Sequence, residues 1–210
     1  MSEYVERVKQ KSIDRTVNAL RKNRFSAHYV KDTIELKEKV MEYLKPGMSC
    51  SSGGSMTIDE TGVIDLLRSG DYEFLDRRAI GVDAQEMEHN TFKCDVYFMS
   101  SNAITEDGKL YNVDGRGNRI AALAYGPKKV IVVAGANKIV PDIEAARQRN
   151  RHISAPANNM RRGSKAPCAV TGVCTDCSSP ERICCFELVC SQQLIAERIT
   201  VLILPDTYGF

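Results

Sequence analysis

The chain has 210 residues, of which 43% are hydrophobic and 27% charged, and its formal net charge is +2. This composition is ordinary for a globular protein with a sizeable core, and it argues against strong electrostatic attraction to nucleic acid or membrane surfaces. No stretch reaches the roughly 20 apolar residues of a membrane span, and no targeting segment is visible. We therefore expect a cytoplasmic protein that binds neither nucleic acid nor membrane.

Helical and strand patterns alternate through the first two-thirds of the chain. Apolar residues at helical spacing predict a first helix over residues 3–24. Asp32 with Glu35 matches a capping box that begins a second helix, and Thr57 with Glu60 repeats the pattern. Further strands are predicted at 26–30, 48–52, 72–75, 95–99, 109–113 and 130–134, and further helices at 57–69, 82–90, 118–125 and 141–149.

This alternation predicts an α/β fold with a mostly parallel sheet and helices on both faces. The pattern then changes, because residues 154–185 lack periodicity and contain five cysteines. Two β-rich runs follow, at 186–190 and 199–204, within residues 186–210. We therefore expect an α/β core over 1–153, a cysteine-rich metal-binding loop over 154–185, and a C-terminal β segment over 186–210 that returns to the core.

The cysteine-rich loop has the spacing of a metal site. Cys174 and Cys177 are separated by two residues, so both sulfurs can face one metal. Together with Cys168 and Cys184 they supply four thiolates, which suit either one Zn²⁺ or one [4Fe-4S] iron–sulfur cluster. Cys185 is the alternative fourth ligand. Binding would contribute on the order of 10 kcal/mol of folding energy to a loop without apolar anchors.

Other roles for the cysteines fit the sequence less well. Structural disulfides are rare in the cytoplasm. A redox Cys-x-x-Cys pair would open a helix after a strand, whereas a Ser-Ser-Pro run follows Cys177. Unligated thiols remain an alternative. Cys50, Cys94 and Cys190 lie in apolar runs, which predicts ordinary core positions.

The middle of the chain, SSNAITEDGKLYNVDGRGNR, is dense in groups that bind or transform a small polar ligand. Asn102 follows a predicted strand, and Glu106 is the natural general base or ligand. Asp114 is a second candidate catalytic carboxylate. Asn118 and Arg119 begin a predicted helix, where free amides attract an anion and an arginine can bind a carboxylate or phosphate through two hydrogen bonds.

Two further patterns carry alternative interpretations. Gly53, Gly54 and Ser55 stand between a strand and a helix and would cradle an anion, although a plain tight turn fits equally well. The segment around Glu106 also fits a β-hairpin with its turn at Asp107, and a hairpin does not exclude a site. A basic run near the cysteines is interpreted as a solvated face able to dock an anionic partner. It comprises Arg147, Arg149, Arg151, Arg161, Arg162 and Lys165.

The chain resembles the LUD-domain family of lactate utilisation proteins in five separated segments and in its ending RITVLILPDTYGF. The segments are GGSMT at 53–57, SSNAITEDG at 100–108, VDGRGNR at 113–119, YGPKKVIVVAG at 125–135 and the cysteine segment at 167–184.

This resemblance implies a fold similar to that of sugar-phosphate isomerases and CoA-transferases. It also implies a link to bacterial oxidation of L-lactate to pyruvate by a multi-protein iron–sulfur system. We therefore expect a protein of lactate or related hydroxy-acid utilisation that binds a small carboxylate or phosphate-bearing ligand. Iron–sulfur is slightly favoured over zinc, and the expected partners are other lactate-utilisation proteins or a second copy of the chain. Two alternatives stay open: a non-redox acyl, CoA or sugar-phosphate enzyme that uses Glu106, and a non-catalytic binding or regulatory subunit.

Overall fold

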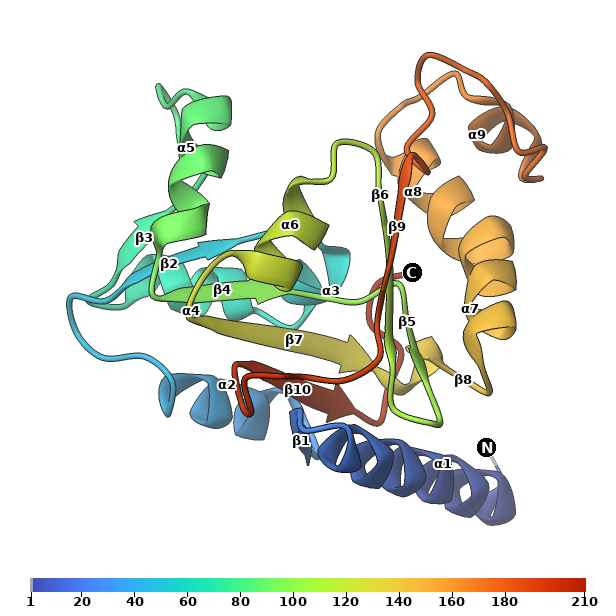
Figure 1. The fold of residues 1–210 in the computed structure, drawn as a ribbon, viewed down its shortest axis with the longest axis horizontal. Helices are drawn as coiled ribbons and strands as arrows, with labels where there is room; N and C mark the ends of the chain where they lie inside the picture. The colour runs from blue at the N-terminus through green and yellow to red at the C-terminus, as the bar shows by residue number, and fades with distance from the viewer. Residues whose placement is uncertain (1) are drawn as a thin grey trace.

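The computed structural model describes residues 2–210, and a six-stranded sheet lies at its centre (Figure 1). All neighbouring strands of this sheet are parallel, which confirms the α/β fold with a mostly parallel sheet. From one edge to the other, the strands are β1 (Ser26–Tyr29), β10 (Ile199–Leu204), β7 (Lys129–Gly135), β4 (Val96–Met99), β2 (Ser49–Ser52) and β3 (Glu73–Leu75).

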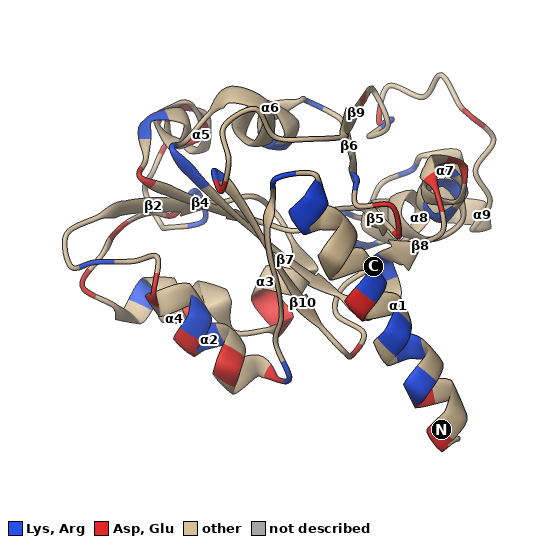
Figure 2. Cartoon of the chain, turned by 60° about the horizontal axis from the view of Figure 1, so that its bottom comes forward, with Lys and Arg blue, Asp and Glu red and all other residues tan. Residues whose placement is uncertain are grey.

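Helices cover both faces of the parallel sheet, as Figure 2 shows with the strands passing between them. One apolar cluster joins α1 (Glu3–Lys22) and α6 (Asn118–Tyr125) to the sheet, and β10 supplies three of its residues. The cluster on the opposite face joins α2 (Thr33–Met41), α3 (Met56–Glu60) and α4 (Val63–Ser69). Every residue of β10 is buried, because this strand lies between β1 and β7 and is covered on both faces.

A second, four-stranded sheet lies beside the first. Its order is β8 (Ile139–Val140), β5 (Ala103–Thr105), β6 (Leu110–Asp114) and β9 (Phe186–Cys190). β5 and β6 are antiparallel, so the hairpin interpretation of the middle segment is confirmed. Gly108 has φ +83° in its turn, a conformation that favours glycine. β9 pairs antiparallel with β6, and this pairing brings the end of the cysteine segment beside Asp114.

The helix predicted at 141–149 continues much further than expected. α7 (Ile143–Arg149) leads through a π-helical turn (Asn150–Ser154) into α8 (Ala155–Arg161). Pro156 lies in the first turn of α8. A proline there lacks the amide hydrogen of a regular helix and crowds the preceding turn, which accounts for the local π geometry. Residues 154–161, expected to be irregular, are therefore helical.

The remaining helices are short. α5 (Ala84–Asn90) passes into a 3₁₀ turn (Thr91–Lys93), a second 3₁₀ turn (Ala136–Lys138) follows β7, and α9 (Pro167–Thr171) begins the cysteine segment. No helix within residues 2–210 combines the length and apolar character needed to cross a bilayer.

Two helix starts show how well local patterns predict boundaries. The Asp32 side chain accepts hydrogen bonds from the amides of Ile34 and Glu35, so it caps α2 as predicted. The prediction of a cap at Thr57 is wrong, because Ser55 caps α3 and accepts a hydrogen bond from the amide of Ile58. Thr57 is instead fully buried, and its hydroxyl donates to the carbonyl of Tyr208.

Candidate functional site

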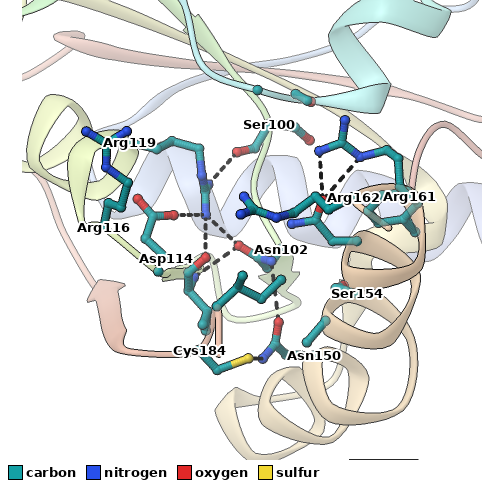
Figure 3. Close-up of a pocket in the computed structure, with 18 of the residues that line it drawn as sticks. Ser100, Asn102, Asp114, Arg116, Arg119, Asn150, Ser154, Arg161, Arg162 and Cys184 are labelled. Carbon is teal, nitrogen blue, oxygen red and sulfur yellow. Dashed lines mark hydrogen bonds and ion pairs between the residues drawn. The ribbon is translucent and has the colours of Figure 1, made fainter. Parts of the chain in front are cut away.

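A cavity of about 540 Å³ lies at the carboxyl edge of the parallel sheet. β2, β4 and β7 all end at this edge, and the residues that follow β2 and β4 form part of the wall. Other parts of the wall come from the loop after β6, from helix α8 and from residues 180–185 of the cysteine segment (Figure 3). We call this cavity the anion pocket. Six residues predicted from the sequence as site residues line it: Gly54, Ser55, Asn102, Asp114, Asn118 and Arg119.

An ion pair between Arg119 and Asp114 organises one wall of the anion pocket. Their side chains lie 2.7 Å apart and are only 13% and 7% exposed. Arg119 also donates to the carbonyls of Ser100 and Val113 and to the side chain of Asn102. The second oxygen of Asp114 accepts a hydrogen bond from the amide of Ile120 in the first turn of α6. Arg119 was expected to bind a ligand through two hydrogen bonds. In the structure its guanidinium donates to groups of the protein and holds the pocket wall in place.

Asn102 and Asn150 extend this network towards the cysteines. The Asn102 side-chain oxygen accepts from Arg119 and from the amide of Val113, and its nitrogen donates to Asn150 at 3.4 Å. Asn150 then approaches the sulfur of Cys184 at 3.9 Å. Figure 3 shows this sequence of side chains from Arg119 to Cys184. The π-helical turn carries Asn150, so the irregularity after α7 helps to set its position.

Basic side chains outnumber acidic ones in the anion pocket, which favours a negatively charged ligand. Arg77 and Arg116 both pair with Glu88, so their charges are partly neutralised. Arg162 has no carboxylate within ion-pair distance in residues 2–210, and Arg161 bonds only to Asn158. The basic residues in the lining are Arg77, Arg116, Arg119, Lys138, Arg161, Arg162 and Arg182, against the acidic residues Glu88, Asp114 and Glu181.

The basic run that begins in α7 is not a uniformly solvated face. Arg149 is 8% exposed and donates to the carbonyls of Asn102 and Asn137, and burial lowers the pKa of its guanidinium to about 10. Arg161 and Arg162 face the anion pocket opposite Arg119 (Figure 3). Arg149 is the buried member of the run, whereas Arg161 and Arg162 remain exposed at the rim of the pocket.

Lys138 is a buried amine that the sequence did not mark. It ends the 3₁₀ turn after β7, is 3% exposed and lines the anion pocket. Its Nζ donates to the hydroxyls of Thr57 at 2.8 Å and Ser100 at 3.0 Å. Burial, with the positive charges of Arg149 and Arg119, lowers the pKa of Lys138 to about 7. Its place after the most apolar strand was the only available signal.

The glycine pair acts through close packing. A Cβ atom on Gly53 would lie 2.7 Å from the Tyr97 hydroxyl and 3.3 Å from the Arg119 side chain. A Cβ atom on Gly54 would lie 2.4 Å from the Arg77 guanidinium. Glycine at these positions therefore lets both arginines reach the pocket wall. Of the pair, Gly54 lines the pocket, whereas Gly53 lies outside the lining and packs against Tyr97 and Arg119.

Glu106 lies apart from the anion pocket. It ends the β5 side of the hairpin, and its carboxylate accepts hydrogen bonds from Ser12 and Arg15 of α1. The Ser12 hydroxyl and the Arg15 guanidinium hold the pKa of Glu106 below its usual value. It lines neither of the two cavities described in this section. Its contacts are those of a residue that fixes α1 to the hairpin.

A second cavity of about 210 Å³ collects the cysteines of the C-terminal segment. Cys168, Cys174, Cys177, Cys184 and Cys185 all line this cysteine cavity, and none forms a disulfide. Burial raises the pKa of the Cys184 thiol, and the nearby Cys174 and Cys168 raise it further. Cys185 is exposed, so Cys184 is the better placed of the two neighbours.

Amide groups approach two of these sulfurs. Asn159 donates to Cys168 at 3.3 Å from a buried position, and Asn150 approaches Cys184. Hydrogen bonds to sulfur are a usual second layer around thiolate-bound metals. Arg182 spans the loop, because its guanidinium donates to the carbonyls of Cys177 and Cys184.

Within residues 2–210, no three His, Cys, Asp or Glu side chains are placed to hold a metal ion. A four-iron cluster binds one thiolate at each of four separate corners, whereas Zn²⁺ requires four sulfurs at about 2.3 Å from one point. The cysteines share one cavity, and the choice between a cluster and Zn²⁺ stays a prediction. The three cysteines predicted as core residues are buried or half-buried: burial raises the pKa of Cys50 and Cys94 to about 12 and of Cys190 to about 11.

Comparison with known proteins adds a family match over most of the chain. A family model described as LUD domain matches residues 13–204. A DUF162 family protein from Deinococcus radiodurans has a similar structure, with a TM-score of 0.54 and 13% identity, over 94% of this chain and 98% of that chain. At this identity the likeness concerns the fold alone. No curated protein sequence matches the chain.

Two other solved structures show weaker likeness. The eIF2B beta protein from Chaetomium thermophilum has a TM-score of 0.38 and 13% identity, over 52% of this chain and 43% of that chain. Ribose 5-phosphate isomerase from Plasmodium falciparum has a TM-score of 0.32 and 18% identity, over 52% of each chain. Scores this low assign no fold, so a relationship to sugar-phosphate isomerases stays a prediction.

Proposed function

Because the chain belongs to the LUD domain family, we propose that it acts in the utilisation of lactate or a related hydroxy acid. In this proposal the anion pocket binds a small carboxylate or phosphate-bearing ligand, next to one cysteine-ligated metal centre. The observation that carries the proposal is the wall shared by the two cavities. Arg182, Ile183, Cys184 and Cys185 line both of them, so a ligand and a metal centre would be close neighbours.

The residues of the anion pocket divide into two roles. Arg119 bonds to both Asp114 and Asn102, and these three side chains hold the wall in shape. Arg161 and Arg162 have free hydrogen-bonding capacity and would bind the anionic group of the ligand. Asn118 at the start of α6 and Ser55 at the cap of α3 would add polar contacts.

The metal centre would be held by Cys168, Cys174, Cys177 and Cys184. A four-iron cluster bound there would supply one-electron chemistry beside the ligand. Zn²⁺ remains the alternative, and it would require the four sulfurs to draw together. Asn159 and Asn150 would orient the thiolates at Cys168 and Cys184 by hydrogen bonding.

The alternative of a non-redox acyl, CoA or sugar-phosphate enzyme that uses Glu106 has less support. The Glu106 carboxylate is bound by Ser12 and Arg15, and Glu106 does not line the anion pocket. A non-catalytic binding subunit would use the same anion pocket, and it differs from our proposal only by the lack of turnover.

Metal analysis of the anaerobically purified protein tests the cysteine site. We expect brown protein that contains iron and acid-labile sulfide, and we expect Cys177→Ser to lose both. Cys190→Ser is the matched control, since Cys190 lies outside the cysteine cavity and should leave the iron content unchanged. Colourless protein with one equivalent of zinc would contradict the iron–sulfur part of the proposal.

Calorimetric titration with L-lactate, pyruvate and inorganic phosphate tests the anion pocket. We expect at least one of them to bind, and Arg162→Met to weaken that affinity about tenfold or more, since a hydrogen bond to a charged group contributes about 1.5–3 kcal/mol. Glu106→Gln is the control and should bind as the wild type does. If none of the three anions binds, or if Glu106→Gln abolishes binding and Arg162→Met does not, this part of the proposal is wrong.

A further inference from the structure

The buried amine of Lys138 has surroundings unlike those of an ordinary lysine. Its two side-chain partners are the hydroxyls of Thr57 and Ser100, and no carboxylate in residues 2–210 lies within ion-pair distance of its Nζ. Buried lysines are normally paired with an acid, because a lone ammonium group is costly to desolvate. The amine is therefore held in place without a group that would keep it charged.

The charges that face Lys138 favour its neutral form. Arg149 from α7 and Arg119 from α6 place positive charge near the amine, and the negative charge of Glu60 in α3 opposes them. Burial acts in the same direction as the arginines and is the largest effect on the pKa. A substantial fraction of Lys138 is consequently unprotonated near neutral pH.

The hydrogen bonds also orient the nitrogen. The Thr57 hydroxyl donates its hydrogen to the carbonyl of Tyr208 at 3.0 Å, so its oxygen must accept from Lys138. Ser100 accepts a second N–H. A neutral amine has two N–H groups and one lone pair, so donation to both hydroxyls leaves the lone pair free. Lys138 lines the anion pocket, which places its side chain within reach of a ligand bound there.

We propose that Lys138 is a nucleophile that condenses with the ketone of a 2-oxo carboxylate bound in the anion pocket. A neutral amine adds little to anion binding, but it is the reactive form towards a carbonyl. The nitrogen forms a bond to the carbonyl carbon, and the carbonyl oxygen leaves as water with the two amine hydrogens, which yields an imine. Arg161 and Arg162 would bind the carboxylate, and the hydroxyl hydrogen of Ser100 can be donated to the carbonyl oxygen.

This inference rests on the proposed function, since it uses the same pocket, and it assigns the ligand class as a 2-oxo acid. The imine withdraws electrons from the neighbouring carbon. When the ligand is pyruvate, its methyl protons should therefore exchange with solvent, because the enamine forms reversibly. No oxidant or reductant is needed for this step.

Reductive trapping tests the proposal directly. The anaerobically purified protein is incubated with pyruvate and cyanoborohydride at neutral pH, and the modified lysines are located by peptide mass spectrometry. We expect Lys138 to acquire a three-carbon acid adduct about tenfold or more faster than exposed Lys128, because solvated amines are almost fully protonated at this pH. Lys138→Met should lose the fast adduct, and the matched Lys128→Met variant should keep it.

Proton NMR of pyruvate in D₂O gives a second measurement that needs no variant. The wild-type protein should accelerate deuteration of the methyl group, and prior trapping of Lys138 should stop it. Labelling confined to exposed lysines, or deuteration at the rate of buffer, would overturn the assignment of Lys138. Calorimetric binding of pyruvate would still support the anion pocket in that case, so the two proposals fail separately.

Discussion

Replacement of Arg119 by methionine tests the organisation of the anion-pocket wall. The substitution would leave the carboxylate of Asp114, which is 7% exposed, without its ionic partner. It would also remove donors from two carbonyls and from Asn102. Loss of one member of a buried ion pair typically costs 3–5 kcal/mol, so we expect a loss of about this size in the free energy of unfolding. For a chain of this length, the melting temperature should fall by roughly 6–20 °C.

Urea denaturation followed by circular dichroism measures this loss. Arg116→Met is the matched control, because Arg116 lies in the loop just before α6, makes an ion pair with Glu88 and is 66% exposed. It should cost at most about 1 kcal/mol. Adding Asp114→Asn to Arg119→Met should recover about 1 kcal/mol or more, since the unpaired charge disappears. If Arg119→Met costs no more than Arg116→Met, Asp114 is not a buried charge held by Arg119 and the reasoning fails.

Two further predictions concern groups that line or support the pocket. Burial lowers the pKa of Lys138 to about 7 in the folded chain. Between about pH 7 and pH 10, Lys138 is therefore protonated in the unfolded chain but has lost its proton in the folded chain. The free energy of unfolding consequently rises with pH over this range. Lys138→Met lacks this titration, so its free energy of unfolding relative to that of the wild type should be highest below about pH 7. Above that pH the difference should fall by up to about 1.4 kcal/mol per pH unit. A difference in the free energy of unfolding that does not change with pH, measured by urea denaturation, would contradict this. Gly53→Ala should cost about 1–3 kcal/mol through its contact with buried Tyr97, and Gly54→Ala should cost less because the end of the Arg77 side chain can move. Equal losses in the two variants, measured by thermal unfolding, would show that Gly53 is not tightly packed.

The sequence predicted elements whose apolar periodicity extends over several residues. The helix over 3–24 and the strands at 130–134 and 199–204 have continuous patterns, and the structure contains an element at each place. β5 and β8 have three and two residues, so no period can be recognised within them. Residues 154–161 lack helical patterning because one side of this helix faces the anion pocket, where polar and basic residues replace apolar ones.

The candidate site was predictable only where a local pattern marks it. Asn102, Asp114 and Asn118 follow strands or begin a helix in a polar loop, and they do line the pocket. Glu106 fits the same pattern, but the hairpin turns its carboxylate towards α1. Lys138 was not predicted, because lysine side chains are usually exposed. The burial of Lys138 depends on packing against segments that are distant in sequence.

The shared wall between the two cavities has a thermodynamic consequence. Arg182 and Cys184 belong to both, and hydrogen bonds join Cys184 to Arg119 through two asparagines. In our proposal the cysteines would hold a redox centre. The free energy by which a bound anion changes the reduction of that centre would then equal the free energy by which reduction changes the affinity for the anion. A tenfold change in affinity would thus appear as a shift of about 59 mV in a one-electron midpoint potential. Electrochemical titration with and without ligand would therefore report occupancy of the neighbouring cavity.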